Sequence, residues 1–304
     1  MKHSFTFFLL LCSATGFGQF RIVQAEKLPL PPGILWTAPR FSPAGSHLYI
    51  TSNGYDGIWE YDIAGGKLRQ ITADPRAGYG FALSSDGRRI AYRRVIFADG
   101  AQGRTQEIIE LDLVSMRSRT LESGPAVPTP VFVGDQVVYS TEAGATSPGT
   151  IGAISPPVVL GVEKTKIAMV REGKKTLFDP FGDGRYIWPS LSPDGERILA
   201  YEMRRGTFVC DTDGTHLQRL GRRDAPVWTR DGRWIVFMES RDDGDRLISS
   251  EIACVAADGS SPVRLSAADG KIKIDPDCSP AEDTIAYATD DGSIWLMHYR
   301  EEGR

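Results

Sequence analysis

The sequence predicts an all-β protein folded as a six-bladed β-propeller of four-stranded antiparallel blades. Its 32 Gly and 19 Pro residues gather in short clusters between apolar runs, where turns need them. A turn of the Ser-Pro-Asp-Gly type followed by a short apolar strand recurs six times. The strands after these turns begin 42, 47, 61, 37 and 50 residues apart, and a blade of four short strands takes about 40 to 50 residues.

The six copies of this turn and strand differ in how well they keep the motif. The best-kept copy is "SLSPDGERILAY" from Ser190. The others are "RFSPAGSHLYIT" from Arg40, "ALSSDGRRIAYR" from Ala82, "VFVGDQVVYS" from Val131, "VWTRDGRWIVFM" from Val227 and "DCSPAEDTIAYA" from Asp277. Pro presets φ in such a turn, Ser or Asp bonds the backbone, and Gly takes a positive φ. These residues define the repeat, and we assign none of them a catalytic role.

A third strand follows in every unit, and a fourth follows in the first five. Third strands begin at 58, 108, 167, 207, 252 and 294, and fourth strands at 67, 118, 174, 217 and 262. The sixth unit lacks its fourth strand, but a spare segment, "FRIVQAEKLPL", precedes the first unit. We therefore expect an N-terminal strand to pair with the last blade, which closes the ring and leaves no free sheet edge.

The third unit is the longest. Residues 142–163, rich in Gly, Pro and small side chains, are predicted to be an insertion in blade three. We expect its apolar part to pack against the neighbouring blade, with a cap or contact surface as the alternative.

The first 18 residues are predicted to be a signal peptide whose end lies no later than residue 25. A basic start is followed by an apolar run from Phe5 to Cys12 and by small residues at positions 14, 16 and 18. The run is too short to span a bilayer, which takes about 20 residues. We expect residues 19–304 to be one exported domain, periplasmic or secreted, monomeric and not inserted in a membrane.

Charge and cysteine content limit the partners and the disulfides that we expect. The net charge is −4, and the chain has no long basic run, so nucleic acid is not an expected partner. Cys210, Cys254 and Cys278 are interpreted as buried apolar side chains, although one disulfide among them remains an alternative.

The pattern from Pro189 to Tyr201, and more loosely from Asp224 to Phe237, resembles the TolB-type propeller repeat of bacterial periplasmic proteins. The resemblance covers residues 27–300 and implies the fold far more than the function. It implies a propeller without the additional domain of full TolB proteins, so the partners of TolB are not assumed.

The same repeat occurs in some sugar-acid lyases, so an enzyme is the alternative. The three histidines beyond the expected signal peptide, His47, His216 and His298, fall on parts of the ring that do not converge. We therefore predict no metal site, no cofactor and no catalytic group. A small lyase or hydrolase acting on a carbohydrate or peptide would use channel-facing carboxylates such as Asp275 or Asp277.

A binding surface is expected on the face that holds the starts of the innermost strands and the loops after the second strands, because there the copies stop agreeing. Aromatic groups and Arg suit protein, peptide or anionic glycan partners. The candidate binding residues are Trp36, Tyr79, Arg93, Arg94, Tyr186, Trp188, Arg204, Arg205, Arg241 and Lys273. The alternative is that the Arg residues are solvated and the aromatic rings pack between blades.

Overall fold

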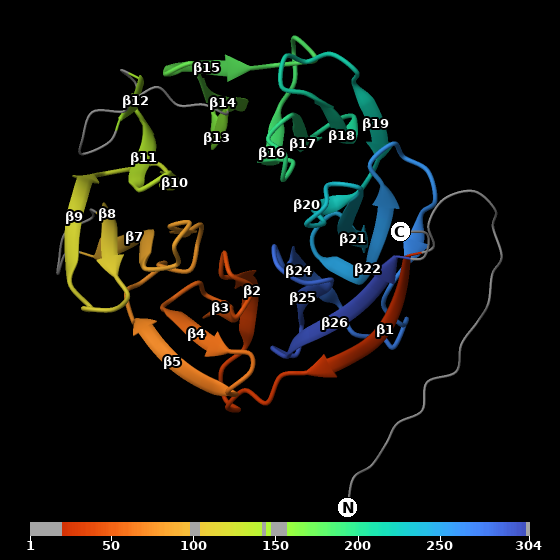
Figure 1. The fold of residues 1–304 in the computed structure, drawn as a ribbon, viewed down its shortest axis with the longest axis horizontal. Coiled ribbons are helices and arrows are strands. Elements are labelled where there is room, and N and C mark those ends of the chain that lie inside the picture. Colours follow the sequence, from red (N-terminus) through yellow and green to blue (C-terminus); the bar gives the residue numbers. More distant parts are fainter. Residues whose placement is uncertain (1–19, 98–103, 142–143, 147–156, 302–304) are drawn as a thin grey trace, which may run out of the picture.

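The computed structural model describes residues 20–97, 104–141, 144–146 and 157–301, and this part of the chain contains strands and no helix. Its strands form seven antiparallel sheets arranged around a ring (Figure 1). Five sheets have four strands and two have three. The predicted all-β propeller is confirmed. Its six repeat units contain seven sheets because the third unit carries both of the three-stranded ones.

Four of the four-stranded blades follow the chain in simple order. They are β2 (Trp36–Phe41), β3 (His47–Ser52), β4 (Ile58–Asp62) and β5 (Lys67–Thr72); β6 (Ala82–Leu83), β7 (Arg89–Phe97), β8 (Arg104–Asp112) and β9 (Ser118–Gly124); β16 (Tyr186–Leu191), β17 (Arg197–Glu202), β18 (Gly206–Asp211) and β19 (Gln218–Gly221); and β20 (Asp224–Trp228), β21 (Trp234–Asp242), β22 (Leu247–Ala256) and β23 (Val263–Arg264). In each blade the first strand lies nearest the ring axis (Figure 1).

The fifth four-stranded blade closes the ring as expected. It orders β1 (Phe20–Lys27), β26 (Ile294–Glu301), β25 (Thr284–Thr289) and β24 (Lys273–Cys278). The pairing of β1 with β26 runs from Phe20 opposite Glu301 to Lys27 opposite Trp295. Phe20 is buried, stacks on Tyr299 with ring centroids 4.4 Å apart, and meets the edge of Trp234. The N-terminal strand therefore adds a buried side chain to the hydrophobic core in addition to its backbone pairing with β26.

The third unit differs from the prediction of one four-stranded blade with an insertion. Two three-stranded sheets lie there: β10 (Val131–Val133), β11 (Gln136–Thr141) and β12 (Gly144–Thr146), then β13 (Val158–Glu163), β14 (Lys166–Arg171) and β15 (Lys174–Phe178). Residues 158–163, expected in the insertion, are β13, and the expected third strand is β14. Lys164 and Thr165 both have positive φ, the geometry of a two-residue hairpin turn. Most of the remaining expected insertion, and the expected signal peptide, lie outside the described residues.

The repeated turn is held by its own side chains. In the best-kept copy, Ser192 Oγ accepts the Arg197 N–H at 2.9 Å, Asp194 accepts the Glu196 N–H at 3.1 Å, and Gly195 has a φ of 76°. The Asp194 carboxylate is used within the turn. Cys210 and Cys254 are buried, Cys278 is partly buried, and all three thiols are free.

Candidate binding site on the ring axis

The innermost strands of four blades carry the same bulge. Pairing shifts register after Thr37, Ile187, Asp224 and Ile274, each time just before the strand reaches its turn. The residue that precedes Pro in each bulge has a positive φ of 45° to 53°: Ala38, Trp188, Ala225 and Asp275. Non-glycine residues rarely adopt this conformation, and a residue before Pro is normally extended. Backbone outliers of this kind gather at functional sites, so the four bulges indicate a candidate functional site at the ring axis.

A cavity of about 360 Å³ opens beside three of these bulges. It is lined from several blades by Thr37, Asn53, Tyr55, Trp188, Arg222, Asp224, Ala225, Met238, Ser240, Leu247, Ile274 and Asp275. Most of these residues come from first strands or from the loops that lead into them or follow second strands, and Met238, Ser240 and Leu247 come from β21 and β22. We call this space the axial cavity, and the face onto which these loops project the entry face.

Most charges of the axial cavity are already paired. Arg222 lies 2.5 Å from Asp242 and 3.4 Å from Asp224, and Asp224 also accepts a hydrogen bond from Ser240. Asp275 accepts the Thr37 hydroxyl at 2.9 Å. Among the residues that the structure describes, Asp275 forms no ion pair. The cavity therefore contains one carboxylate without a cation beside it.

Aromatic rings border the cavity from opposite parts of the ring. Tyr55 meets the exposed Tyr79 edge to face at 5.2 Å, and the Arg93 guanidinium lies 5.3 Å from the Tyr79 ring. Burial, and then the charge of Asp275, raises the pKa of Tyr55. Trp188 is 45% exposed and packs edge to face with Tyr201, with ring centroids 5.8 Å apart. The structure thus places Trp188 in the wall of the cavity and Tyr79 against the lining residue Tyr55, with Arg93 behind Tyr79.

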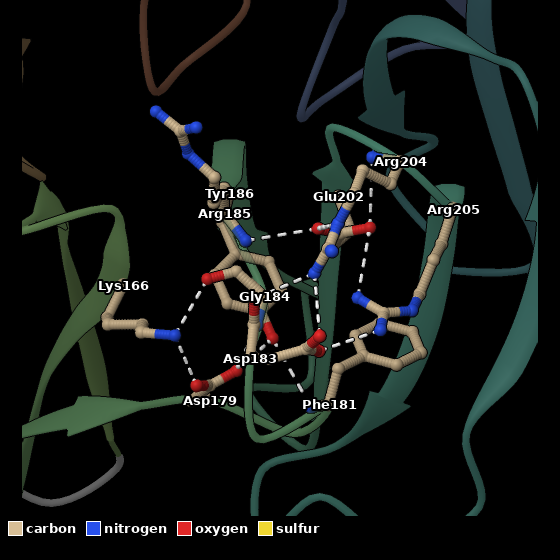
Figure 2. Close-up of polar contacts among 10 residues, drawn as sticks. All are labelled: Lys166, Asp179, Phe181, Asp183, Gly184, Arg185, Tyr186, Glu202, Arg204 and Arg205. Carbon is tan, nitrogen blue, oxygen red and sulfur yellow. Dashed lines mark hydrogen bonds and ion pairs between the residues drawn. The ribbon is translucent and has the colours of Figure 1, made fainter.

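Three of the expected binding residues are buried and serve the fold. Trp36 donates to the Pro31 carbonyl and packs against Trp59. Tyr186 donates to Asp179 at 2.5 Å (Figure 2), and burial followed by this bond raises its pKa. Lys273 lies between Glu251 and Asp269 and donates to a backbone carbonyl.

Three of the four Arg residues in the expected pairs are held by carboxylates of the protein itself, and the fourth, Arg93, donates to the Val127 carbonyl at 3.2 Å. Arg94 contacts Glu107 at 2.7 Å. Arg204 and Arg205 both contact Asp183 at 2.7 Å and clamp the loop before β16 (Figure 2). Their hydrogen bonds lower the pKa of Asp183. The two pairs sit on blades at different sides of the ring (Figure 1), and the structure does not join them into one patch.

Arg241 is exposed near the end of β21, opposite Ser249 of β22. It lies on the long hairpin of that blade and is not among the residues that line the axial cavity.

Asp275 and Asp277 occupy different surroundings although they are two residues apart. Asp277 pairs with Arg40 at 3.1 Å, accepts the Phe41 N–H at 2.8 Å, and lines a second cavity of about 270 Å³. Burial raises the pKa of Asp277, against the opposing effect of Arg40. Each carboxylate is held by its own donors from β2, so the two join blades across the closure of the ring.

The sequence did not single out several residues of the axial cavity. Tyr55, Arg222 and Asp224 lie in loops or at strand ends whose lengths vary from blade to blade. One sequence pattern could have predicted part of the cavity. In three copies of the repeat the residue directly before Pro, which is Trp188, Ala225 or Asp275, lines it.

Within the described ranges, no group of three or more His, Cys, Asp or Glu side chains is arranged to hold a metal ion. No helix in those ranges is long and apolar enough to cross a membrane.

The fold and the axial cavity define a β-propeller protein, and known proteins agree with that class. No protein-family model matches the chain. Uncharacterized protein Atu1656 of Agrobacterium fabrum strain C58 is 28% identical over 181 residues, which is 57% of this chain and 59% of that protein. The chain thus spans less than two thirds of that relative.

Solved structures with a similar fold include TolB from Acinetobacter baumannii, with a TM-score of 0.53, 15% identity, and coverage of 78% of this chain and 55% of that one. The Cps50 (Swd1) β-propeller domain of Myceliophteria thermophila has a TM-score of 0.63 at 12% identity, covering 90% and 99%. An oligogalacturonate lyase in complex with manganese has a TM-score of 0.50 at 13% identity, covering 86% and 76%. At these identities the likeness shows the fold alone, and TolB is among the proteins that share it.

Proposed function

We propose that this protein is an exported, non-catalytic binding propeller that engages a protein or peptide partner through its entry face. The observation that carries the proposal is the axial cavity, which lies where four blades meet and is lined by residues that differ between them. Concave sites with apolar walls and a few polar groups are the usual form of a binding site.

Exposed apolar side chains on the entry face support a protein partner. Tyr79, Phe97, Trp188, Met203 and Ile248 are each 45% to 66% exposed and lie at the starts of first strands or around the loops after second strands. Exposed large apolar groups that gather on one face are typical of interaction surfaces.

Affinity capture with paired variants tests the proposal. The protein lacking residues 1–18 is used to capture partners from the envelope extract of an exporting bacterium, followed by mass spectrometry. The double variant Tyr79→Ala, Trp188→Ala is expected to lose the captured partner. Val114→Ala with Met116→Ala removes exposed apolar side chains from the turn after β8, on the opposite face, and is expected to retain it. Equal capture by both variants would contradict a partner on the entry face.

A lyase or hydrolase is the second candidate, because Asp277 is a buried carboxyl with a raised pKa beside a cavity and one protein of similar fold is a lyase. We disfavour the enzyme because the Asp277 carboxylate already forms an ion pair with Arg40 and accepts the Phe41 N–H, and it does not pair with Asp275. Incubation with oligogalacturonate is expected to yield no unsaturated product. Product formation that Asp277→Asn abolishes would favour the enzyme.

A further inference from the structure

We propose that the axial cavity binds the basic side chain, Lys or Arg, of a peptide segment, with Asp275 as its ionic partner. This inference rests on the proposed function and names the chemistry of the ligand. It reverses the charge expected from the Arg residues of the sequence. The structure places Arg94, Arg204 and Arg205 in internal ion pairs, and neither Arg93 nor Arg241 is among the residues that line the cavity.

Asp275 is the group that sets the charge of the ligand. Its backbone adopts a φ of 53° in the bulge of β24, and its side chain reaches the cavity wall. The Thr37 hydroxyl donates to Oδ2 at 2.9 Å, which fixes the carboxylate without neutralising it. A carboxylate that is oriented in advance forms a stronger bond with an incoming cation because less order is lost on binding.

The other charged residues of the cavity cannot compensate Asp275. Arg222 is the cationic residue in its lining, and it already contacts Asp224 and Asp242. With two carboxylates and one guanidinium in the wall, the cavity carries one excess negative charge. This negative charge would repel an anionic ligand, whereas a basic side chain would neutralise it.

The remaining walls suit the stem of a long basic side chain. Met238, Leu247 and Ile274 provide apolar contact for methylene groups, and the Tyr55 and Trp188 rings line the same space, where the face of an aromatic ring attracts a cation. The volume lies near the lower end of the range for ligand sites, about 300 to 1,000 Å³. It fits one extended side chain better than a folded chain or a long oligosaccharide.

Blocked tripeptides of the form acetyl-Gly-X-Gly-amide are the probes for this cavity. Isothermal titration with X as Arg, Lys, Gln and Glu is performed on the protein lacking residues 1–18. Saturable binding is expected for Arg and Lys, at least about tenfold tighter than for Gln, with no binding of Glu. Free butylguanidinium is measured alongside, and it is expected to bind more weakly than the Arg peptide because it lacks backbone contacts.

Asp275→Asn is the main variant, since Asn tolerates positive φ and keeps an acceptor for Thr37. A loss of about tenfold or more, equivalent to about 1.4 kcal/mol, is expected for the Arg peptide. Asp245→Asn makes the same charge change on an exposed turn of the entry face and is expected to bind like the unchanged protein. Trp188→Leu should weaken the Arg peptide severalfold, and thermal melting of each variant verifies folding.

The outcomes separate this inference from the proposed function. Equal binding of Gln and Arg peptides, unchanged affinity in Asp275→Asn, or no binding of any tripeptide at millimolar concentration would overturn the basic-side-chain ligand. Tighter binding of butylguanidinium than of the Arg peptide would overturn the peptide ligand and indicate a small organic cation instead. In each case capture through Tyr79 and Trp188 decides the proposed function independently.

Discussion

Phe20→Ala tests how much the N-terminal strand contributes to the ring. Phe20 is 3% exposed, stacks on Tyr299 and touches Trp234, so the substitution removes a buried ring and two aromatic contacts. Loss of a buried Phe costs about 3 to 5 kcal/mol. For roughly 280 residues, an unfolding entropy of about 0.6 kcal/mol per kelvin converts about 4 kcal/mol into a melting temperature lower by about 7 °C.

Val23→Ala is the matched control, because Val23 lies on the same strand and is 45% exposed. It is expected to change the free energy of unfolding by no more than about 0.5 kcal/mol. Differential scanning calorimetry and urea unfolding measure both variants. If Phe20→Ala melts within about 1 °C of Val23→Ala, the aromatic contacts of β1 do not support the last blade as argued.

The same contacts limit where the mature chain would begin in the exported form that we propose. Cleavage at residue 25, the latest expected signal end, would delete Phe20 and most of the strand that pairs with β26. We expect the intact mass of the exported protein to place its first residue at or before Phe20. A mature chain that begins after Ile22 would show that the ring closes without this core.

Two further predictions concern the blades. The buried Glu202 carboxylate accepts two backbone N–H groups. Glu202→Ala should therefore lower the free energy of unfolding by about 2 to 4 kcal/mol, and Glu202→Gln by less, measured by urea unfolding. Burial acts to raise the pKa of Glu202, but these bonds and two guanidinium groups outweigh it and lower the pKa; the stabilisation is therefore complete above about pH 4.3 and is lost as pH falls through the lowered pKa. A Glu202→Gln difference that stays constant into acid would contradict this. In Gly78→Ala the new Cβ would lie 2.1 Å from Thr51 Oγ1 and 2.4 Å from Thr51 Cβ. Calorimetry should therefore show a free energy of unfolding lower by about 1 to 3 kcal/mol. Gly54→Ala is the control and should change it little, because the nearest atom to its new Cβ is a flexible Asp56 oxygen 3.4 Å away.

The blades with a Ser-Pro-Asp-Gly turn could be predicted from the sequence because that turn is held by local bonds. Ser192 and Asp194 bond within five residues of themselves, so the motif carries its own geometry. The hairpin of β13 and β14 turns at Lys164 and Thr165, which are neither Gly nor Pro, so its composition does not indicate a turn. The same long spacing was therefore interpreted as an insertion.

The site was less predictable because ion pairing is not local in sequence. Arg204 looks like a free cation beside Arg205, yet its partner Asp183 lies 21 residues earlier. Arg94 likewise finds Glu107 across a hairpin. Aromatic residues at the starts of first strands were recognised, but whether each faces the core or the axis depends on the bulge, so Tyr186 is buried while Trp188 lines the cavity.

The bulge before Pro explains how a repetitive ring can hold a specific site. Its geometry recurs at Ala38, Trp188, Ala225 and Asp275, so the backbone fixes the position while the side chain varies. Asp tolerates a positive φ, but for Trp such a conformation costs about 1 to 3 kcal/mol and persists only where the surrounding structure holds it. Ala225 leaves space, Trp188 supplies an aromatic wall and Asp275 supplies charge. Exchanging Trp188 or Asp275 should therefore change which ligand binds while the ring remains folded, whereas exchanging the Pro that follows either should disturb the bulge itself.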